Sequence, residues 1–168
     1  MTEVRKNWFA LYTKPRAEFK AEEQLKAEDI ENYLPTYKTI RQWSDRKKKI
    51  TVPLLPGYIF VHATEKERLT ALEQMSIVRT IIFEGKPAVI PDWQIENLQR
   101  LLDRDPEVSV IDRIMTGTRV KITSGSFCDV EGIVVLEANN ERNLVVSIDM
   151  LNRSVIVKLP ANSVVKKV

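Results

Sequence analysis

Two residue types that often take part in catalysis each occur once in this chain, as His62 and Cys128. A serine–histidine–aspartate or cysteine–histidine site would therefore have to use His62. This histidine ends the apolar, strand-like run GYIFVHA with no glycine elbow nearby, a position that suits a polar residue at a strand end. The sequence also lacks a Walker loop, a GxGxxG motif and an HExxH motif. We therefore expect a protein that is not an enzyme and needs no cofactor.

The single cysteine limits other kinds of chemistry as well. It cannot form a disulfide within the chain, and it excludes a zinc site built from several cysteines. The N-terminal run MTEVRKNWFALYTKPR carries cations without the long apolar segment of a signal peptide. No stretch approaches the roughly 18 consecutive apolar residues of a membrane span. We expect a cytoplasmic protein with no metal site and no membrane association.

Binding is the chemistry that remains, and its strongest signal is a local cluster of cations. The formal charge is only +3 over 168 residues, so whole-chain charge says little about nucleic acid. Residues 38–49, in contrast, hold a run of cations against one anion, Asp45. A charge run is usually a solvated turn, so phosphate contact and simple solvation both stay open here. The cations are Lys38, Arg41, Arg46, Lys47, Lys48 and Lys49.

The apolar pattern around this cluster predicts a first domain that mixes strands and helices. The run WFALYT is aromatic and apolar, which suits a central strand. A surface helix opens at Pro15, with Ala17, Ala21 and Leu25 on a narrow apolar stripe. Two strands follow, joined by the turn SDRKKK: NYLPTYKTIRQW, where Pro35 forces an edge or a bulge, and ITVPLLPGYIFV, which is broken at Pro53 and at Pro56-Gly57.

The next segment completes that domain. EKERLTALEQM predicts a short helix with Leu69 and Leu72 facing inward, and SIVRTIIFEGKPAVIP predicts a strand, a turn and a short strand. A helix beginning at Pro91 places Ile95, Leu98 and Leu102 on one stripe. The order β-α-β-β-α-β-α predicts an α+β fold, a ferredoxin-like α/β sandwich over residues 7–105.

From residue 106 the pattern changes. Residues 106–116 have no sustained period and predict a linker. Residues 117–168 hold the short alternating runs TRVKIT, GIVVLE, LVVSIDM and SVIVKL, which predict an all-β, SH3-like barrel. Valine, isoleucine and threonine crowd these runs and favour strands. We therefore expect a stable barrel that does not refold into helices.

Motifs in both domains carry a resemblance to one family. GTRVKITSGSFCDVEGIVV resembles the KOW motif, with Gly132 at its glycine, a residue that allows a bulge or a close approach of backbones. Trp8, PRAE at the first helix, YLP at 33–35 and PLLPGYIFV at 53–61 resemble the NusG N-terminal (NGN) domain. The chain thus resembles the NusG/RfaH family of transcription elongation and antitermination factors. The QWSDRKKK hairpin and the short length are most similar to its UpxY-type specialised paralogues.

The resemblance implies a partner for the first domain. NGN domains of this family bind the clamp helices of the largest RNA polymerase subunits and suppress pausing, and binding the elongating state more tightly than the paused state suffices for that. Aromatic side chains of this kind can anchor a partner helix. The alternative is that they are plain core, although tyrosines suit a half-wet contact. The matching positions are Trp8, Tyr12, Tyr58, Phe60, Ile82 and Phe83.

The resemblance also implies contact with DNA of the elongation complex. Specialised members touch the non-template strand near the start of the first helix, where a helix N-terminus favours phosphates. A solvated helix face is the alternative there. A second contact of the family, with the polymerase gate loop, would fall in HATEKE at 62–67, which has only Thr64 where paralogues carry several threonines. The predicted nucleic-acid-binding residues are Lys14, Arg16, Lys20, Arg41, Arg46, Lys47, Lys48 and Lys49.

The KOW domain of the family recruits a further partner, the termination factor Rho or the ribosomal protein NusE. Phe127, in a loop that we expect to be exposed, and Gly132 are the candidate contacts, although Phe127 would equally suit a cap on the barrel end. Two other functions stay open: a general NusG-type factor that promotes Rho-dependent termination, and a ribosome-associated KOW protein that binds RNA. In each case we expect a monomer.

Overall fold

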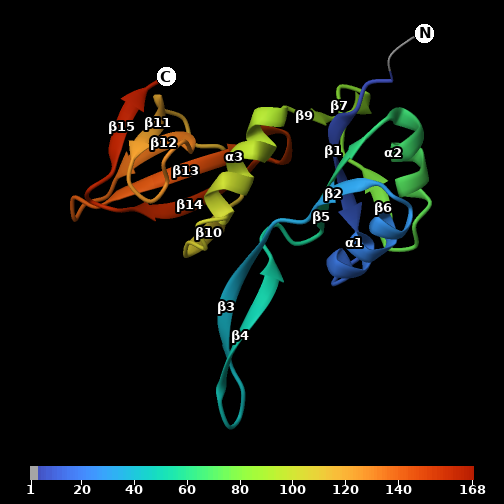
Figure 1. Cartoon of the computed structure of the whole chain (residues 1–168), viewed down its shortest axis with the longest axis horizontal. Coiled ribbons are helices and arrows are strands. Elements are labelled where there is room, and N and C mark those ends of the chain that lie inside the picture. The colour runs from blue at the N-terminus through green and yellow to red at the C-terminus, as the bar shows by residue number, and fades with distance from the viewer. Residues whose placement is uncertain (1–3) are drawn as a thin grey trace. The chain divides into compact units, whose positions relative to one another are not determined.

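The computed structural model describes residues 4–168, and the chain forms two compact units (Figure 1). The first unit comprises the chain up to Thr36 together with Pro53–Asp92, and the second comprises Tyr37–Val52 and Trp93–Val168. The domain boundaries drawn from the sequence, after residues 105 and 116, stay predictions. The division between the two compact units comes earlier in the chain than the predicted boundary after residue 105, because the helix that follows Asp92 belongs to the second unit.

The first unit is built on an antiparallel sheet in the order β2-β5-β1-β6, with β9 pairing β1 beyond that path. Its two helices follow the first and third of those strands in the chain, which is the βαββαβ order of a ferredoxin-like sandwich. The predicted α/β character of this region is therefore confirmed. The strands are β1 (Asn7–Thr13), β2 (Glu31–Tyr33), β5 (Tyr58–Ala63), β6 (Ile77–Thr80), β7 (Ile82–Phe83), β8 (Lys86–Pro87) and β9 (Val89–Ile90), and the helices are α1 (Glu18–Ala27) and α2 (Glu65–Leu72).

Strand alternation gives this sheet one face for the core. The inward residues of β1 and β5 pack against small and branched side chains of the helices, so a narrow stripe is enough to bury α1. The predicted inward positions Ala21 and Leu25 are confirmed. The core cluster includes Phe9, Leu11, Ala21, Leu25, Ile59, Val61, Ala71 and Ile77.

Helix α1 begins later than Pro15. Arg16 has a φ of +60°, a left-handed conformation that a helix cannot include, and the regular turns start at Glu18. The residues from Lys14 to Ala17 instead form a turn, in which the Ala17 N–H donates to the Lys14 carbonyl at 3.1 Å. Proline therefore precedes this helix instead of occupying its first turn.

Helix α2 presents a different face from the predicted one. Leu69 is 51% exposed, which contradicts the inward position expected for it, and the buried residues are Arg68 and Ala71. Arg68 is tolerated there because its guanidinium lies 5.6 Å from the centre of the Phe9 ring and forms an ion pair with Glu65. Leu72 packs partly against the core, as predicted.

Prolines interrupt the middle segment. The predicted breaks at Pro53 and Pro56 are confirmed, whereas Pro35, predicted as an edge or bulge within one strand, separates two strands. Pro35 stands between β2 and β3 (Thr36–Gln42), and the turn after β4 (Lys47–Pro53) contains Gly57 with a φ of +88°. Glycine adopts a left-handed backbone conformation easily because it has no Cβ, which explains why Gly57 stands in the turn before β5. Strands β3 and β4 pair only with each other, as a two-stranded hairpin (Figure 1).

The second unit contains a six-stranded sheet in the order β10-β14-β13-β12-β11-β15. The strand character of residues 119–167 agrees with the prediction, and a barrel that does not refold into helices stays a prediction. Within residues 4–168 no pairing joins β10 to β15, so the sheet is open and the expected SH3-like barrel is not shown. The elements are α3 (Asp92–Leu102), β10 (Val108–Ile111), β11 (Arg119–Ser124), β12 (Glu131–Leu136), β13 (Arg142–Ile148), the 3-10 turn Asp149–Leu151, β14 (Arg153–Leu159) and β15 (Val164–Lys167).

The segment expected as a linker contributes strand β10. It pairs with β14 from Val108↔Val157 to Ile111↔Ser154, and the Ser154 hydroxyl donates to the Arg113 carbonyl at 2.7 Å. Alternating Val108, Val110 and Ile111 thus extend the sheet, although the run was too short and too close to Pro106 to indicate a strand from sequence alone.

Helix α3 lies against the sheet through polar side chains. The Asn97 amide donates to the Glu131 carbonyl at 2.7 Å and accepts from the Glu131 N–H at 2.7 Å, as a neighbouring strand would. Gln94 donates to Asp149 at 3.2 Å, and the Arg119 guanidinium lies 4.8 Å from the centre of the Trp93 ring. Of the predicted apolar stripe, Ile95 and Leu98 are buried. The third buried apolar residue of the helix is Leu101, whereas the predicted Leu102 is half-buried.

Among the helices of residues 4–168, none combines the length and the hydropathy needed to cross a lipid bilayer.

Candidate functional site

The face of the first sheet opposite its helix-covered core carries most of the predicted aromatic residues. Because alternate side chains of a strand point to opposite faces, Trp8 and Tyr12 of β1 share this face with Tyr58 and Phe60 of β5. The register pairs Tyr12 with Tyr58 and Trp8 with His62 directly across the two strands. Four of the six residues predicted to bind polymerase are therefore brought together.

Three strands contribute to a row that we call the tyrosine row, formed by Tyr58, Tyr12 and Arg79. The Tyr58 hydroxyl donates to the Tyr12 hydroxyl at 3.4 Å, and the two ring centres lie 4.9 Å apart at an angle of 37°. The Arg79 guanidinium lies 4.5 Å from the centre of the Tyr12 ring. The row combines aromatic surface, hydroxyl groups and one exposed cation, a mixture common where proteins meet.

A second row lies at the other end of the same strands. His62 of β5 stacks on Trp8 of β1, with ring centres 5.0 Å apart and an angle of 25°. Its Nδ1 contacts the carboxylate of Glu31, which is opposite His62 in the register of β2 and β5. The one histidine of the chain thus joins two neighbouring strands of the sheet, through the Trp8 ring on β1 and the Glu31 carboxylate on β2.

Burial separates the predicted polymerase-binding residues into two groups. Phe60 is fully buried, and Trp8 and Tyr58 are less than a tenth exposed. Tyr12 is half-buried, whereas Ile82 and Phe83 are exposed on the short β7–β8 hairpin, whose turn places Glu84 and Gly85 at positive φ. Replacement of an exposed residue tests binding directly, whereas replacement of a buried one also changes the stability of the fold.

Sequence reasoning missed Arg79 and Glu31 as neighbours of this face. Both are joined to it by strand register, Arg79 through Tyr12 on β1 and Glu31 through His62 on β5. Register depends on turns and on the whole sheet, so no local pattern around either residue indicated its neighbours. A signal existed only in the type of Arg79, a cation within an otherwise apolar strand.

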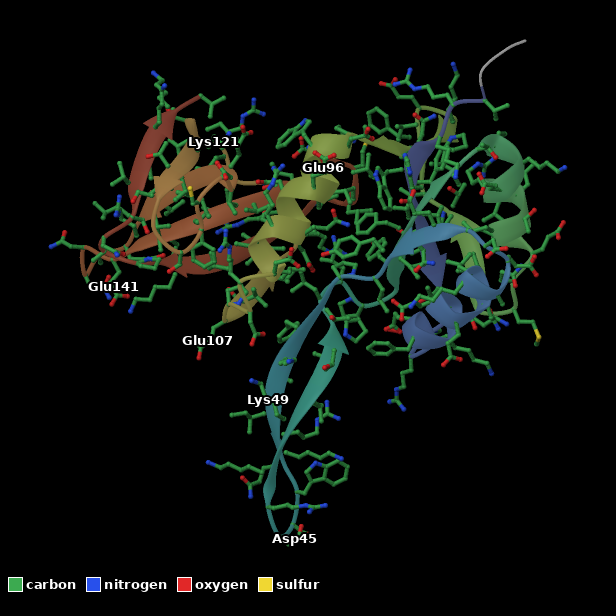
Figure 2. All side chains as sticks on the ribbon, in the orientation of Figure 1. Asp45, Lys49, Glu96, Glu107, Lys121 and Glu141 are labelled. Atoms are coloured by element: carbon green, nitrogen blue, oxygen red, sulfur yellow. The ribbon has the colours of Figure 1, made fainter. Side chains whose placement is uncertain are left out.

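The predicted cationic turn is the end of the β3–β4 hairpin, which we call the basic hairpin (Thr36–Pro53). Figure 2 shows Asp45 at its loop and Lys49 along β4. Trp43 donates its N–H to the Arg46 carbonyl at 2.7 Å and closes the loop. Nearly every side chain of residues 38–49 is exposed, including all the predicted cations of the hairpin and the apolar Ile40.

Acidic residues lie near the base of the basic hairpin but hardly near its loop end. Within residues 4–168, none of its six cations forms an ion pair. At the base of the hairpin, a shallow hollow is lined by Lys38 and Lys49 together with Asp105 and Glu107. No acid other than Asp45 lies near the loop end in the sequence, so the positive potential is highest there.

The third predicted group, Lys14, Arg16 and Lys20, lies exposed before and within the first turn of α1. Phe19, between them, is also exposed, a feature that the sequence analysis did not single out. The helix has no side-chain cap, which leaves N–H groups at its N-terminus open to other acceptors.

The segment predicted to face the gate loop forms the cap of α2. The Thr64 hydroxyl accepts the Glu67 N–H at 3.1 Å, and the Glu67 carboxylate accepts the Thr64 N–H at 3.0 Å, a reciprocal capping box. This backbone hydrogen bond, followed by the charges of Lys6 and His62, holds the pKa of Glu67 below its ordinary value of 4.5. Thr64 therefore stabilises the N-terminus of α2.

The two residues predicted for partner contact in the second unit lie inside it. Phe127 is 5% exposed, so its expected exposure is wrong and its place is that of a core residue. Gly132 is buried because β12 and β13 approach closely: a Cβ there would stand 2.5 Å from the Val145 carbonyl oxygen. The close backbone approach predicted for this glycine is confirmed.

A comparison with protein families decides the relationship. The family model described as NusG, transcription termination factor nusG, matches residues 6–99, more than half of the chain. The chain belongs to the NusG family. The matched range contains the tyrosine row, the basic hairpin and α1, so all three surfaces lie within the part that the NusG model recognises.

Solved structures of NusG and of a related complex are similar to the chain at low identity. One is described as domain interaction in Thermotoga maritima NusG: it is 22% identical, with 92% of this chain and 93% of that chain covered and a TM-score of 0.48. Another, the MjSpt4:Spt5 complex in conformation B, is 21% identical, with 96% of each chain covered and a TM-score of 0.31. No curated protein matches the chain significantly.

Proposed function

We propose that this member of the NusG family is a transcription elongation or antitermination factor that binds RNA polymerase through its first unit. The observation that carries the proposal is the family match over residues 6–99, which contains the aromatic face and the tyrosine row. The factor would favour the elongating state by binding it more tightly than the paused or terminating state. Such a mechanism needs no covalent step, and we propose that the protein is not an enzyme.

The tyrosine row and the β7–β8 hairpin are the proposed contacts with the largest polymerase subunits. Tyr12 and Arg79 offer a partly exposed ring, a hydroxyl and a cation, and Phe83 adds exposed apolar surface. A partner helix that carries acidic and apolar side chains would complement this combination. Phe60 and Trp8 would support the surface from below, because both are buried.

The basic hairpin and the start of α1 are the proposed contacts with DNA of the elongation complex. Phosphate contacts by unpaired lysines and arginines add affinity that falls with salt, without reading sequence. The free cations of the hairpin support this role. The hairpin is also the feature for which we place the chain among the UpxY-type specialised paralogues, as a cytoplasmic factor.

A second function is favoured by one observation. The matched family model is described as a termination factor, so a general NusG-type role in Rho-dependent termination is the alternative. In both cases the second unit would recruit a partner, Rho or the ribosomal protein NusE. Since Phe127 is buried, that contact would use other residues.

Transcription in vitro through an intrinsic and a Rho-dependent terminator tests the proposal. With purified polymerase, the protein should increase read-through of the intrinsic terminator and shorten pauses. Increased termination that appears only when Rho is present would favour the alternative function. If transcript lengths and pauses stay unchanged with and without Rho, both functions are contradicted.

Variants of the aromatic face test the polymerase contact itself. Replacement of the exposed Phe83 by alanine and of Tyr12 by serine should weaken co-purification with polymerase while the fold stays intact. Tyr58→Ala should also abolish binding, and Tyr58→Phe, which keeps the ring, is its matched control. Unchanged co-purification of the Phe83, Tyr12 and Tyr58→Ala variants would contradict the assignment of this face.

A further inference from the structure

An indole ring lies among cations at the loop end of the basic hairpin. The hydrogen bond from the Trp43 N–H to the Arg46 carbonyl sets these two residues opposite each other. Alternation along the strands then places Arg41 and Lys48 on the same face as Trp43. A hollow of about 170 Å³ at this end brings Arg46 and Lys48, but not Arg41, to the same place as Trp43. It is lined by Trp43, Ser44, Asp45, Arg46 and Lys48.

The Trp43 ring is available to a ligand. Half of this residue is exposed, 51%, and within residues 4–168 no ring or guanidinium stacks on it. The contrast with the other aromatic–cation neighbours is direct. Arg79 covers Tyr12 at 4.5 Å and Arg119 covers Trp93 at 4.8 Å, whereas Arg41 and Arg46 leave the Trp43 ring uncovered.

The lysines of the hairpin alone would have a structural explanation. A two-stranded ribbon has two free edges, and exposed lysines keep such edges from pairing with other chains. An exposed tryptophan does the opposite, because it adds apolar surface to an element that has no core of its own. A ligand that needs both a flat apolar surface and positive charges explains the two residue types together.

We propose that Trp43, with Arg41, Arg46 and Lys48, binds unpaired DNA nucleotides. One base would stack on the indole, and the three cations would bind the neighbouring phosphates. A base in a duplex is stacked on its neighbours and leaves no face for the ring, so this site selects single strands. The choice of DNA rests on the proposed function, but base stacking goes beyond the phosphate contact assigned there to the hairpin.

Binding of the full-length protein to a fluorescently labelled oligothymidylate tests the site without polymerase. Trp43→Ala should weaken binding about 5- to 150-fold, the range expected for the removal of one base–aromatic stack. Trp43→Phe should keep most of the affinity because it keeps a ring. Ile40→Ala, which removes an even more exposed apolar side chain from the other face of the hairpin, should have no effect.

Two further ligands separate stacking from charge. An abasic strand of equal length offers phosphates without bases, and on it Trp43→Ala should bind as the unchanged protein does. Between about 50 and 200 mM salt, Trp43→Ala should shift affinity by the same factor throughout, since the variant keeps every cation that binds phosphate. Equal affinity of Trp43→Ala and the unchanged protein for the oligothymidylate would overturn the proposal, as would tighter binding to the matching duplex.

Failure of this site and failure of the proposed function give different results. If Trp43→Ala leaves oligothymidylate binding unchanged while the unchanged protein still increases read-through, only the stacking site is wrong. If the protein has no effect on transcription but Trp43→Ala loses affinity for the oligothymidylate, the site stands and the polymerase role fails. Unfolding by urea should be the same for Trp43→Ala and the unchanged protein, which shows that each result reports binding.

Discussion

The aromatic face of the first unit and the basic hairpin of the second use the same residue types in opposite ways. On the face, aromatic rings are stacked on one another and covered: Trp8 by His62, Tyr12 by Tyr58 and Arg79. On the hairpin, no ring or cation among residues 4–168 is stacked on Trp43, and its neighbouring cations form no ion pair there; all of them are exposed. Aromatic and cationic residues near each other in sequence therefore do not by themselves indicate a binding site; their partners in the fold decide.

The difference follows from where each element obtains its stability. A strand inside a sheet has neighbours on both sides, so its side chains find cross-strand partners and lose exposure. A two-stranded hairpin has no second layer, and side chains on it can be selected for contact with other molecules. Residues of the aromatic face must therefore serve both binding and folding. Residues of the basic hairpin can serve binding alone.

The largest expected difference between the aromatic face and the basic hairpin is in stability, and the pair Phe60→Ala and Trp43→Ala tests it. Phe60 is fully buried, so its truncation should lower the free energy of unfolding by about 3–5 kcal/mol. Trp43→Ala should change it by less than about 0.5 kcal/mol. Urea unfolding followed by circular dichroism measures both. Similar losses for the two variants would show that the hairpin is part of a packed core after all.

Replacing Lys47, Lys48 and Lys49 together by alanine sharpens the functional half of the comparison. The slope of log affinity against log salt for elongation-complex binding should flatten by about 0.9 for each duplex phosphate that is no longer neutralised, up to about 2.7. A filter-binding or anisotropy titration at several salt concentrations measures it. The matched control replaces Lys158, Lys166 and Lys167 of the second sheet and keeps the same net charge change. A slope that does not move in the hairpin variant would make these lysines solvated residues only.

Gly132→Ala tests whether the close backbone approach of β12 and β13 stabilises the second sheet. The added Cβ would meet the Val145 carbonyl oxygen at 2.5 Å, so strands β12 and β13 must separate. We expect a loss of about 1–3 kcal/mol in thermal or urea unfolding. Gly85→Ala is the control for backbone strain, because a Cβ there meets nothing within 4 Å although φ is +77°. An unchanged stability of Gly132→Ala would contradict the close approach.

Acid should affect the first unit and leave the hairpin unchanged. The pKa of Glu67 lies below 4.5 in the folded state, so its carboxylate stabilises the fold above about pH 4.5, and this contribution is lost as pH falls through the folded pKa. The pKa of Glu65 is lowered in the same direction by Arg68. Urea unfolding between pH 3 and 6 should lose part of its pH dependence in Glu67→Gln. Asp45→Asn, in the hairpin loop, should change nothing.

Several elements could be predicted from the sequence because their signals are local. Proline indicated the irregularity before β3 and the break before β5, alternating apolar residues indicated strands β11 to β14 of the second sheet, and the six cations marked the hairpin. Other local predictions failed, among them the start of α1 at Pro15 and the linker that instead contains β10. Leu69 is exposed because the capping box starts α2 at Glu65 and turns Arg68 inward, and Phe127 is buried although small and polar residues surround it in sequence.

The sequence by itself determined the family, the classes of elements and the concentration of charge at the hairpin. These depend on residue type and on spacing within one segment, where hydrophobic period and turn chemistry act directly. Only the tertiary structure decided that Tyr58, Tyr12 and Arg79 form one row, that Asn97 joins α3 to β12, and that Trp43 has no ring or cation over it. The physical reason is that strand register and the packing of distant segments bring together residues whose positions in the chain carry no record of one another.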